Sequence, residues 1–342
     1  MKQFDPNAAA TLDSGIFGLP FSSEEAALVL LPVPWEATTS YGGGTSHGPA
    51  AILHASKQID LFDIDNGNFF MAGIAMEEIS DEIQHWNRQA RQAAKIIIDG
   101  DESLPDSVLQ QAINKVNVLS EKLNAFAYTE TTRLLAQGKY VGIVGGDHSV
   151  PFGAIQAFLE KYPDMGILHI DAHADLRDSF EGFHYSHASI MHNVMTKTSL
   201  KKLVQVGIRD FCEEEFNFIR NNAARIKTFF DAALSEQKMQ GKSWGLLCDE
   251  IIAELPHEVY VSFDIDGLDP RFCPHTGTPV PGGLDFHEAL FLLKKIVTSG
   301  RKIIGFDLNE VSPGEQGVDS GDEWDANVGA RLLYKLCGWT LK

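Results

Sequence analysis

Acidic and imidazole side chains alternate in one short segment at a spacing that could bind metal ions. Asp171, His173 and Asp175 follow directly after the apolar run 166–170, each two residues from the next. In extended backbone, side chains at this spacing point to the same side. Carboxylates gathered at the end of a buried strand repel one another or lose their solvation unless a cation neutralises them. The spacing therefore indicates a cation site.

Two further segments present the same chemistry. Asp264 and Asp266 follow the run 259–263, and His148 follows a glycine-containing turn after the run 140–144. Two divalent cations, roughly 3.5 Å apart as in two-metal hydrolytic sites, would satisfy every one of these groups. The expected ligands are two histidines and four aspartates: His148, His173, Asp171, Asp175, Asp264 and Asp266. The four aspartate charges would balance two divalent ions.

A ligand set rich in carboxylate and free of thiolate favours Mn²⁺. Ni²⁺, Co²⁺ and Zn²⁺ stay open as alternatives, because geometry and metal supply also decide which ion is bound. Each segment taken alone has a plainer explanation: Asp147 and Ser149 could cap a helix, with His148 structural, and Asp264 with Asp266 could cap a turn. Three such segments at three strand ends together favour the metal site.

Alternating strand and helix patterns predict that these segments meet at one edge of a parallel sheet. The expected strands are 27–33, 140–144, 165–170, 203–208, 226–230, 259–263 and 303–306, and the expected helices are 83–98, 106–135, 151–161, 243–255, 285–298 and 326–336. Open parallel sheets bind ligands at the carboxyl ends of their strands, and Asp307-Leu308-Asn309-Glu310 follows the last strand. No linker or repeat divides the pattern, so we expect one α/β domain over residues 1–342.

Composition excludes several classes of protein. With 342 residues, 44% hydrophobic and 22% charged, the chain resembles an ordinary globular protein. Lys+Arg 28 against Asp+Glu 47 gives a net charge of −19, which opposes binding to nucleic acid or anionic membranes and suits a cationic ligand. The four cysteines form no C-x-x-C pair, and the apolar run 26–33 is too short to span a bilayer. We therefore expect a cytoplasmic protein with free thiols and no membrane partner.

The three segments, Gly145-Gly146-Asp147-His148-Ser149, Asp171-Ala172-His173-Ala174-Asp175 and residues 262–270, resemble the three signatures of the ureohydrolase (arginase/agmatinase) family. The resemblance covers most of the chain, including 44–52, 277–284 and 310–313. It implies a three-layer α/β/α sandwich with a mainly parallel central sheet, a two-manganese cluster and a homo-oligomer, either trimer or hexamer. It also implies hydrolysis of a guanidino compound to urea and an amine by a metal-bridging hydroxide.

Position by position, the resemblance implies that His148, Asp171, Asp175 and Asp264 hold one ion or bridge the pair, while His173 and Asp266 complete the second site. It makes His187 a proton shuttle and Glu310 the carboxylate that pairs with the guanidinium, and Asp175 can pass a proton to the leaving nitrogen. Two positions depart from the family pattern. His275 stands where many relatives have glycine, and Leu308-Asn309 replaces an aliphatic pair.

The loop 176–189 resembles that of agmatinase-type members, so agmatine is the first substrate expected. Asp178 and Glu181 could receive its ammonium group. Arg177 could instead bind the carboxylate of a guanidino acid or pair internally, and His275 could contact substrate or lie in a surface loop. Arginase, guanidinobutyrase, guanidine hydrolase and formiminoglutamase activities stay open, as do a one-metal deacetylase-like amidohydrolase and a metal-binding protein without turnover.

Overall fold

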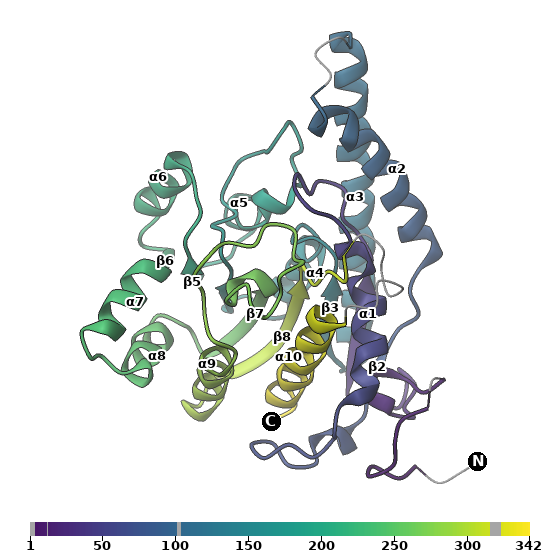
Figure 1. Ribbon diagram of the computed structural model, residues 1–342, viewed down its shortest axis with the longest axis vertical. Coiled ribbons are helices and arrows are strands. Elements are labelled where there is room, and N and C mark those ends of the chain that lie inside the picture. The colour runs from purple at the N-terminus through teal and green to yellow at the C-terminus, as the bar shows by residue number, and fades with distance from the viewer. Residues whose placement is uncertain (1–3, 12, 101–103, 315–322) are drawn as a thin grey trace.

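The computed structural model describes residues 4–11, 13–100, 104–314 and 323–342. Eight strands form one sheet in the order β2-β1-β3-β8-β7-β4-β5-β6, and every neighbouring pair is parallel (Figure 1). The strands are β1 (Leu28–Val33), β2 (Ile74–Met76), β3 (Tyr140–Gly145), β4 (Gly166–Ile170), β5 (Lys202–Ile208), β6 (Ile226–Phe230), β7 (Glu258–Asp264) and β8 (Lys302–Asn309). All seven expected strands are confirmed within a few residues. Strand β2 was not expected, because its three residues are too few to show a pattern.

Helices cover both faces of the sheet, so the expected three-layer α/β/α sandwich is confirmed. The helices are α1 (Gly48–Ala55), α2 (Asp81–Ile98), α3 (Asp106–Ala136), α4 (Phe152–Lys161), α5 (Ile190–Lys197), α6 (Glu213–Asn221), α7 (Asp231–Met239), α8 (Trp244–Ala253), α9 (Phe286–Thr298) and α10 (Trp324–Thr340). The long helices α2 and α3 pack against each other and extend beyond the sheet in Figure 1. The expected helices are confirmed, whereas α1, α5, α6 and α7 were missed.

The alternation of side chains along each strand divides the core into two parts. Leu28 and Leu30 of β1 belong to the part packed under α1 and α7–α10, and Val29 and Leu31 belong to the part under α2–α6. Nearly every position of β1, β3, β4, β7 and β8 is buried, as expected of a parallel sheet with helices on both faces, whereas the edge strand β6 is mostly half-buried. The eight strands thus form one sheet between two helical layers.

Sequence-local signals explain where the long helices begin. Ser80 caps α2 by accepting a hydrogen bond from the backbone N–H of Ile83, and Asp285 forms a capping box with Glu288 at the start of α9. The missed helices have only eight or nine residues. Helices of that length are stabilised by packing rather than by intrinsic propensity, so sequence patterns reveal them poorly. Among the described residues, none of the helices combines the length and apolar character needed to cross a bilayer.

Strand order places the polar segments side by side. The four strands that end in these segments, β3, β8, β7 and β4, are consecutive neighbours in the middle of the sheet. Because all four are parallel, their carboxyl ends lie at one edge. The polar side chains that follow them are therefore brought together there.

Candidate metal centre

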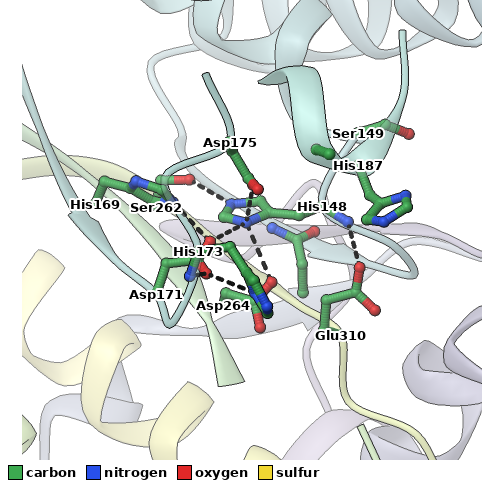
Figure 2. A network of polar contacts seen from close by, with 12 residues as sticks. His148, Ser149, His169, Asp171, His173, Asp175, His187, Ser262, Asp264 and Glu310 are labelled. Carbon is green, nitrogen blue, oxygen red and sulfur yellow. Dashed lines mark hydrogen bonds and ion pairs between the residues drawn. The ribbon is translucent and has the colours of Figure 1, made fainter. Parts of the chain in front are cut away.

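Each of the central strands delivers side chains to a single buried cluster (Figure 2). His148 follows β3, and Glu310 follows β8. Asp264 is the last residue of β7, and Asp266 lies in the 3-10 turn Ile265–Gly267 behind it. The segment after β4 supplies Asp171, His173 and Asp175.

The imidazole of His148 lies at the centre of one group of carboxylates. Its Nδ1 is 2.9 Å from Asp171 Oδ2, 3.2 Å from Asp264 Oδ2 and 3.4 Å from Asp175 Oδ2. His148 and these three aspartates are all buried. One nitrogen surrounded by three carboxylate oxygens is a donor set that suits a divalent cation.

A second group adjoins the first and shares Asp171 with it. His173 Nδ1 is 3.1 Å from Asp266 Oδ2 and 3.5 Å from Asp171 Oδ1. His173 is partly exposed, with 24% of its side chain accessible, whereas Asp266 is buried. All six expected ligands are thus brought together in two adjoining groups, which is the arrangement that a pair of ions needs.

The pKa values of the clustered carboxyl groups indicate whether these residues could bind cations. Burial and the charge of Asp171 raise the pKa of Asp175 well above its ordinary value. Burial, with the charges of Asp266 and Asp171, raises the pKa of Asp264 in the same way. Carboxyl groups that resist ionisation because other carboxylates surround them are relieved by added positive charge. With nitrogen and oxygen donors only, the residues fit two divalent cations.

Tight backbone packing explains the glycines before His148. A Cβ on Gly145 would lie 1.9 Å from Asn309 Oδ1, and a Cβ on Gly146 would lie 1.9 Å from the carbonyl oxygen of Trp35. A side chain at position 146 would therefore collide with the backbone of Trp35, and one at position 145 would displace the Asn309 side chain. The glycines therefore let the chain carry His148 into the cluster.

Two of the polar residues have left-handed backbone, which is rare outside glycine. Asp175 has φ 54° and Glu310 has φ 61°. The carbonyl oxygen of Asp175 accepts hydrogen bonds from the backbone N–H groups of Met191 and His192, each 3.0 Å, and the N–H of Glu310 donates to Gly146 O at 2.7 Å. Such strained positions cluster at functional sites, where surrounding contacts hold them.

The carboxylate of Glu310 is buried with one oxygen unpaired. Its Oε1 accepts a hydrogen bond from the backbone N–H of His148 at 2.9 Å, while Oε2 has no hydrogen-bond partner in the described part of the chain. Burial and the charges of Asp264 and Asp147 raise the pKa of Glu310 well above its ordinary value. A buried carboxylate oxygen without a donor is costly, so this atom is suited to a cationic ligand.

His187 is held beside the cluster by a threonine from another segment. Its Nδ1 lies 3.2 Å from Thr38 Oγ1, and its backbone N–H donates to the same oxygen at 3.2 Å. The guanidinium of Arg91 donates to the carbonyl oxygens of Ala37 and Thr39 and so fixes that segment. Burial lowers the pKa of His187 to about 3, which keeps the imidazole neutral.

A cavity of about 150 Å³ leads from the surface to the cluster. His173, Asp175 and His187 lie along it. Its other charged lining residues are Arg177, Asp210 and Glu215. The cavity is thus small, lined in part by charged side chains, and open to a compact ligand.

The family profile of the arginases matches residues 26–338, nearly the whole chain. The chain belongs to the arginase family. The family implies a binuclear centre of divalent metal, and the buried His/Asp cluster is compatible with one. The resemblance seen in the sequence is confirmed.

Individual relatives agree with this assignment. The chain is 33% identical over 315 residues to the N(1)-aminopropylagmatine ureohydrolase of Thermus thermophilus, covering 92% of this chain and 90% of that one. It is 30% identical to the agmatinase of Bacillus anthracis, with 93% of each chain covered. The solved structure of proclavaminate amidino hydrolase from Streptomyces clavuligerus superposes with a TM-score of 0.71 at 26% identity, covering 98% and 99%. The expected enzyme class, a hydrolase of the ureohydrolase type, is confirmed.

Of the residues expected to bind the substrate's tail, Arg177 lines the cavity and the others do not. Arg177 lines the cavity, with its guanidinium carbon 5.0 Å from the Phe180 ring centroid and Nε 3.8 Å from Glu215 Oε2. Asp178 has 88% of its side chain exposed and faces His192.

Asp178 and the exposed Glu181 lie outside the cavity lining. His275 lies outside it too, because its Nδ1 is 3.1 Å from Asp325 Oδ1 and its backbone N–H donates to Asp325 Oδ2 at 2.9 Å. Contacts between the substrate and Asp178, Glu181 or His275 stay predictions, and the structure does not place these residues in the cavity lining.

Several residues of this arginase-family site were missed in the sequence. Asp210 lies two residues beyond the end of β5 and lines the cavity, so the strand-end rule would have found it. Ser262 Oγ lies 2.9 Å from His148 Nε2 and donates to Asp307 Oδ1 at 2.9 Å, supporting the imidazole from behind. His169 was hidden in a run taken as apolar, although it continues the two-residue spacing of Asp171.

The cluster predicts how pH affects the stability of protein stripped of metal. Raised carboxyl pKa values, as at Asp175 and Asp264, mean that the folded state binds more protons than the unfolded chain above about pH 4, so stability falls as pH rises. Burial lowers the pKa of His148 and His173, but hydrogen bonds and nearby carboxylates outweigh it and raise both well above the ordinary value. The stability that these two histidines contribute is therefore also lost as pH rises.

Asp171 acts oppositely. Burial raises its pKa, but the neighbouring histidines outweigh burial and lower it well below the ordinary value, so its contribution is lost only as pH falls into the acid range. We therefore expect the Tm of the chelated protein to fall between about pH 6 and about pH 9, relative to Mn²⁺-loaded protein, in thermal melts. A gap between the two melts that stayed constant or narrowed as pH rose would contradict this electrostatic picture.

Proposed function

We propose that this arginase-family chain hydrolyses a small cationic guanidino compound, agmatine first, to urea and an amine. Two divalent ions, Mn²⁺ as first choice, would be held by His148, Asp171, His173, Asp175, Asp264 and Asp266. The observation that carries the proposal is the unpaired, buried Glu310 Oε2, on a carboxylate that is hydrogen-bonded to the backbone of His148 within the cluster. Two of the six donors, His173 and Asp175, line the cavity. Glu310 Oε2 is a place for a planar cation next to a cation-binding cluster.

Glu310 would bind and orient the substrate. A guanidinium presents parallel N–H groups that match a carboxylate, and the pair is short and directional. Binding the cation returns Glu310 to its ionised form, because it adds positive charge where burial had raised the pKa of the carboxyl. The hydrogen bond from the N–H of His148 keeps Oε1 in place, so the substrate carbon is held in one position.

Divalent ions at the six side chains would act as Lewis acids and lower the pKa of water toward neutrality. Asp175, whose carboxylate lies 3.4 Å from His148 Nδ1 and lines the cavity, would take up the proton released in the attack and pass it to the leaving nitrogen. His187, which lines the cavity beside Asp175, would relay protons there. Its contact with Thr38 fixes where its ring faces.

The charged side chains that line the cavity favour a substrate whose tail carries an ammonium group over one whose tail carries a carboxylate. Glu215 accepts hydrogen bonds from the backbone N–H groups of Leu176 and Cys212, both 2.9 Å, and lies beside Arg177. This places a negative charge next to the arginine. Asp210 adds a second, exposed carboxylate to the lining. An ammonium group would therefore be attracted to Asp210, in place of the Asp178 and Glu181 first expected to receive it.

Asp210→Asn is expected to lower kcat/KM for agmatine about tenfold, mainly through KM, since an interaction of about 1.4 kcal/mol is lost. Guanidine, which has no tail, should be hydrolysed equally by both proteins. Urea release from each compound measures this. A loss with Asp178→Asn but none with Asp210→Asn would restore the first expectation and contradict the cavity argument.

Arg177 is the observation that favours a second candidate, a guanidino acid, because its guanidinium faces the same cavity. The discriminating measurement is kcat/KM for agmatine, arginine, 4-guanidinobutyrate and guanidine. We expect agmatine to lead. Arginine or guanidinobutyrate leading by about tenfold would contradict the charge argument, and guanidine leading would mean that the loop closes the pocket.

Metal content and urea release separate the remaining alternatives. A one-metal amidohydrolase would bind a single ion, and a metal-binding protein without turnover would release no urea. Reconstitution with Mn²⁺, Ni²⁺, Co²⁺ and Zn²⁺ in turn would identify the ion that supports the highest rate.

We also propose a homo-oligomer, a trimer or hexamer, in the cytoplasm. The exposed Phe62 (71%) and Ile64 (89%) present apolar surface of the kind found at subunit contacts. The four cysteines are unpaired, which suits a reducing compartment. Sedimentation velocity measures the association, and a monomer at micromolar concentration would contradict it.

A further inference from the structure

A row of polar side chains crosses three strands beside the metal centre. His169 of β4 is paired in register with Gln205 of β5, and Gln205 is paired with Thr228 of β6. His169 and Gln205 have no exposed surface, and their neighbours along the strands are apolar. Burying polar groups inside a sheet is costly unless they are hydrogen-bonded, so the direction of these bonds shows what the row does.

The hydrogen bonds fix the orientation of each group. Gln205 Nε2 lies 2.8 Å from the carbonyl oxygen of Ala174, which can only accept, so the amide NH₂ faces that way. The same nitrogen lies 3.1 Å from His169 Nδ1, which must therefore accept. Thr228 Oγ1 donates to the other end of the amide, Gln205 Oε1, at 2.8 Å.

The tautomer of His169 follows from this arrangement. With Nδ1 accepting, the ring proton lies on Nε2, which is 2.7 Å from Asp171 Oδ2 and donates to it. Both ring nitrogens are then occupied, so His169 has no lone pair left for a metal ion. This holds although its nitrogen lies within 4.8 Å of donor atoms on His148, Asp171 and Asp175.

We propose that His169 is a positioning residue that holds Asp171 in its ligating orientation, with Gln205 and Thr228 setting its tautomer. The inference rests on the proposed function, because it assumes that Asp171 binds metal. Asp171 Oδ1 also accepts from the backbone N–H of His173 at 2.6 Å, so both oxygens are held from the protein side (Figure 2). Since Asp171 is shared by the two ligand groups, its orientation affects both ions.

Two substitutions of His169 separate the effect of its hydrogen bond to Asp171 from the effect of its side-chain volume. The amide nitrogen of a glutamine side chain falls near the place of Nε2, and that of asparagine falls near Nδ1. We expect His169→Asn to weaken Mn²⁺ affinity about 10-fold to 100-fold, the usual effect of removing such a partner, and His169→Gln to retain most of it. Free Mn²⁺ followed by electron paramagnetic resonance during titration measures this without any substrate.

Two further substitutions serve as a control for the mutation itself and as a test of the far end of the row. His257→Asn, at an exposed position, should leave affinity unchanged, and Thr228→Val should weaken it a few-fold from the far end of the row. If His169→Asn and the parent bind two ions equally tightly, the proposal is overturned. If both His169 variants saturate with one ion, His169 is itself a ligand and the proposal is also overturned.

Failure of the proposed function would look different from failure of the positioning role. A parent protein that binds two ions with the expected ranking of variants, yet releases no urea from any guanidino compound, would reject the function and keep the positioning role. A parent that binds no divalent ion would reject both. A reduced Tm in His169→Asn with unchanged Mn²⁺ affinity would show a purely structural residue and overturn the proposal.

Discussion

Glu310→Gln should lower kcat/KM for the guanidino substrate by about 100-fold or more, because truncating one partner of a buried charge pair costs about 3 kcal/mol. The amide oxygen of the variant can still accept the hydrogen bond from the N–H of His148, so the fold of the turn is retained. Its NH₂ group would face the incoming guanidinium in place of a carboxylate oxygen. Donor would then meet donor, and the planar cation would lose both its charge partner and its orientation.

Urea release measured beside metal content checks this expectation. Glu254→Gln is a matched control, since Glu254 is a surface acid in an ion pair with Lys202 Nζ. The control should match the parent in rate and in bound metal. If Glu310→Gln retained two ions and the full rate, Glu310 would not bind the substrate, and the mechanism proposed for this site would be wrong.

Asp171→Asn should remove both ions and reduce turnover by about 1,000-fold or more, since it takes away a charged ligand common to the two groups. The aspartate lies 2.9 Å from His148 Nδ1 and accepts from His169 Nε2 at 2.7 Å. An amide NH₂ at Oδ2 would oppose the donor on His169 and would offer the ions no negative charge. Elemental analysis of the purified variant, with urea release from the same preparation, measures both effects.

Asp164→Asn is the matched control for this substitution. Asp164 is exposed and pairs with Lys201 on the surface, so its variant should keep two ions and the parental rate. Retention of one ion by Asp171→Asn would mean that Asp171 serves only one site. Retention of two would mean that the shared position of Asp171 has no part in metal binding.

The sequence predicted the convergence of the metal ligands because a parallel sheet brings strand ends to one edge whatever the order of its strands. His148, Asp171 and Asp264 each follow an apolar run, and that local signal was sufficient. Strand order was not predictable, since the insertion of β8 between β3 and β7 depends on long-range pairing. That insertion brings Glu310 beside His148.

The tail-binding residues illustrate why side-chain direction in a loop cannot be inferred from sequence. Arg177 and Asp178 are adjacent, yet Arg177 turns into the cavity beside Glu215 while Asp178 points to solvent. Glu215 lies on α6, a short helix that the pattern did not reveal. The direction of Arg177 therefore depends on a contact between segments 38 residues apart, which local periodicity does not encode.

The structure also explains what Asn309 contributes behind the site. Asn309, one of the residues at which the sequence departs from the pattern that it resembles, donates through Nδ2 to Asp307 Oδ1 at 2.6 Å. Asp307 accepts from Ser262, which in turn contacts His148 Nε2. The asparagine therefore helps to satisfy a fully buried carboxylate behind the metal centre.

Anomalous diffraction from crystals of the Mn²⁺-loaded protein, recorded at the manganese edge, tests the two-metal site most directly. We expect two peaks at the carboxyl edge of the sheet, one beside His148 and one beside His173, both in contact with Asp171. A single peak, or peaks away from these side chains, would contradict a two-metal site and the guanidino hydrolysis proposed from it.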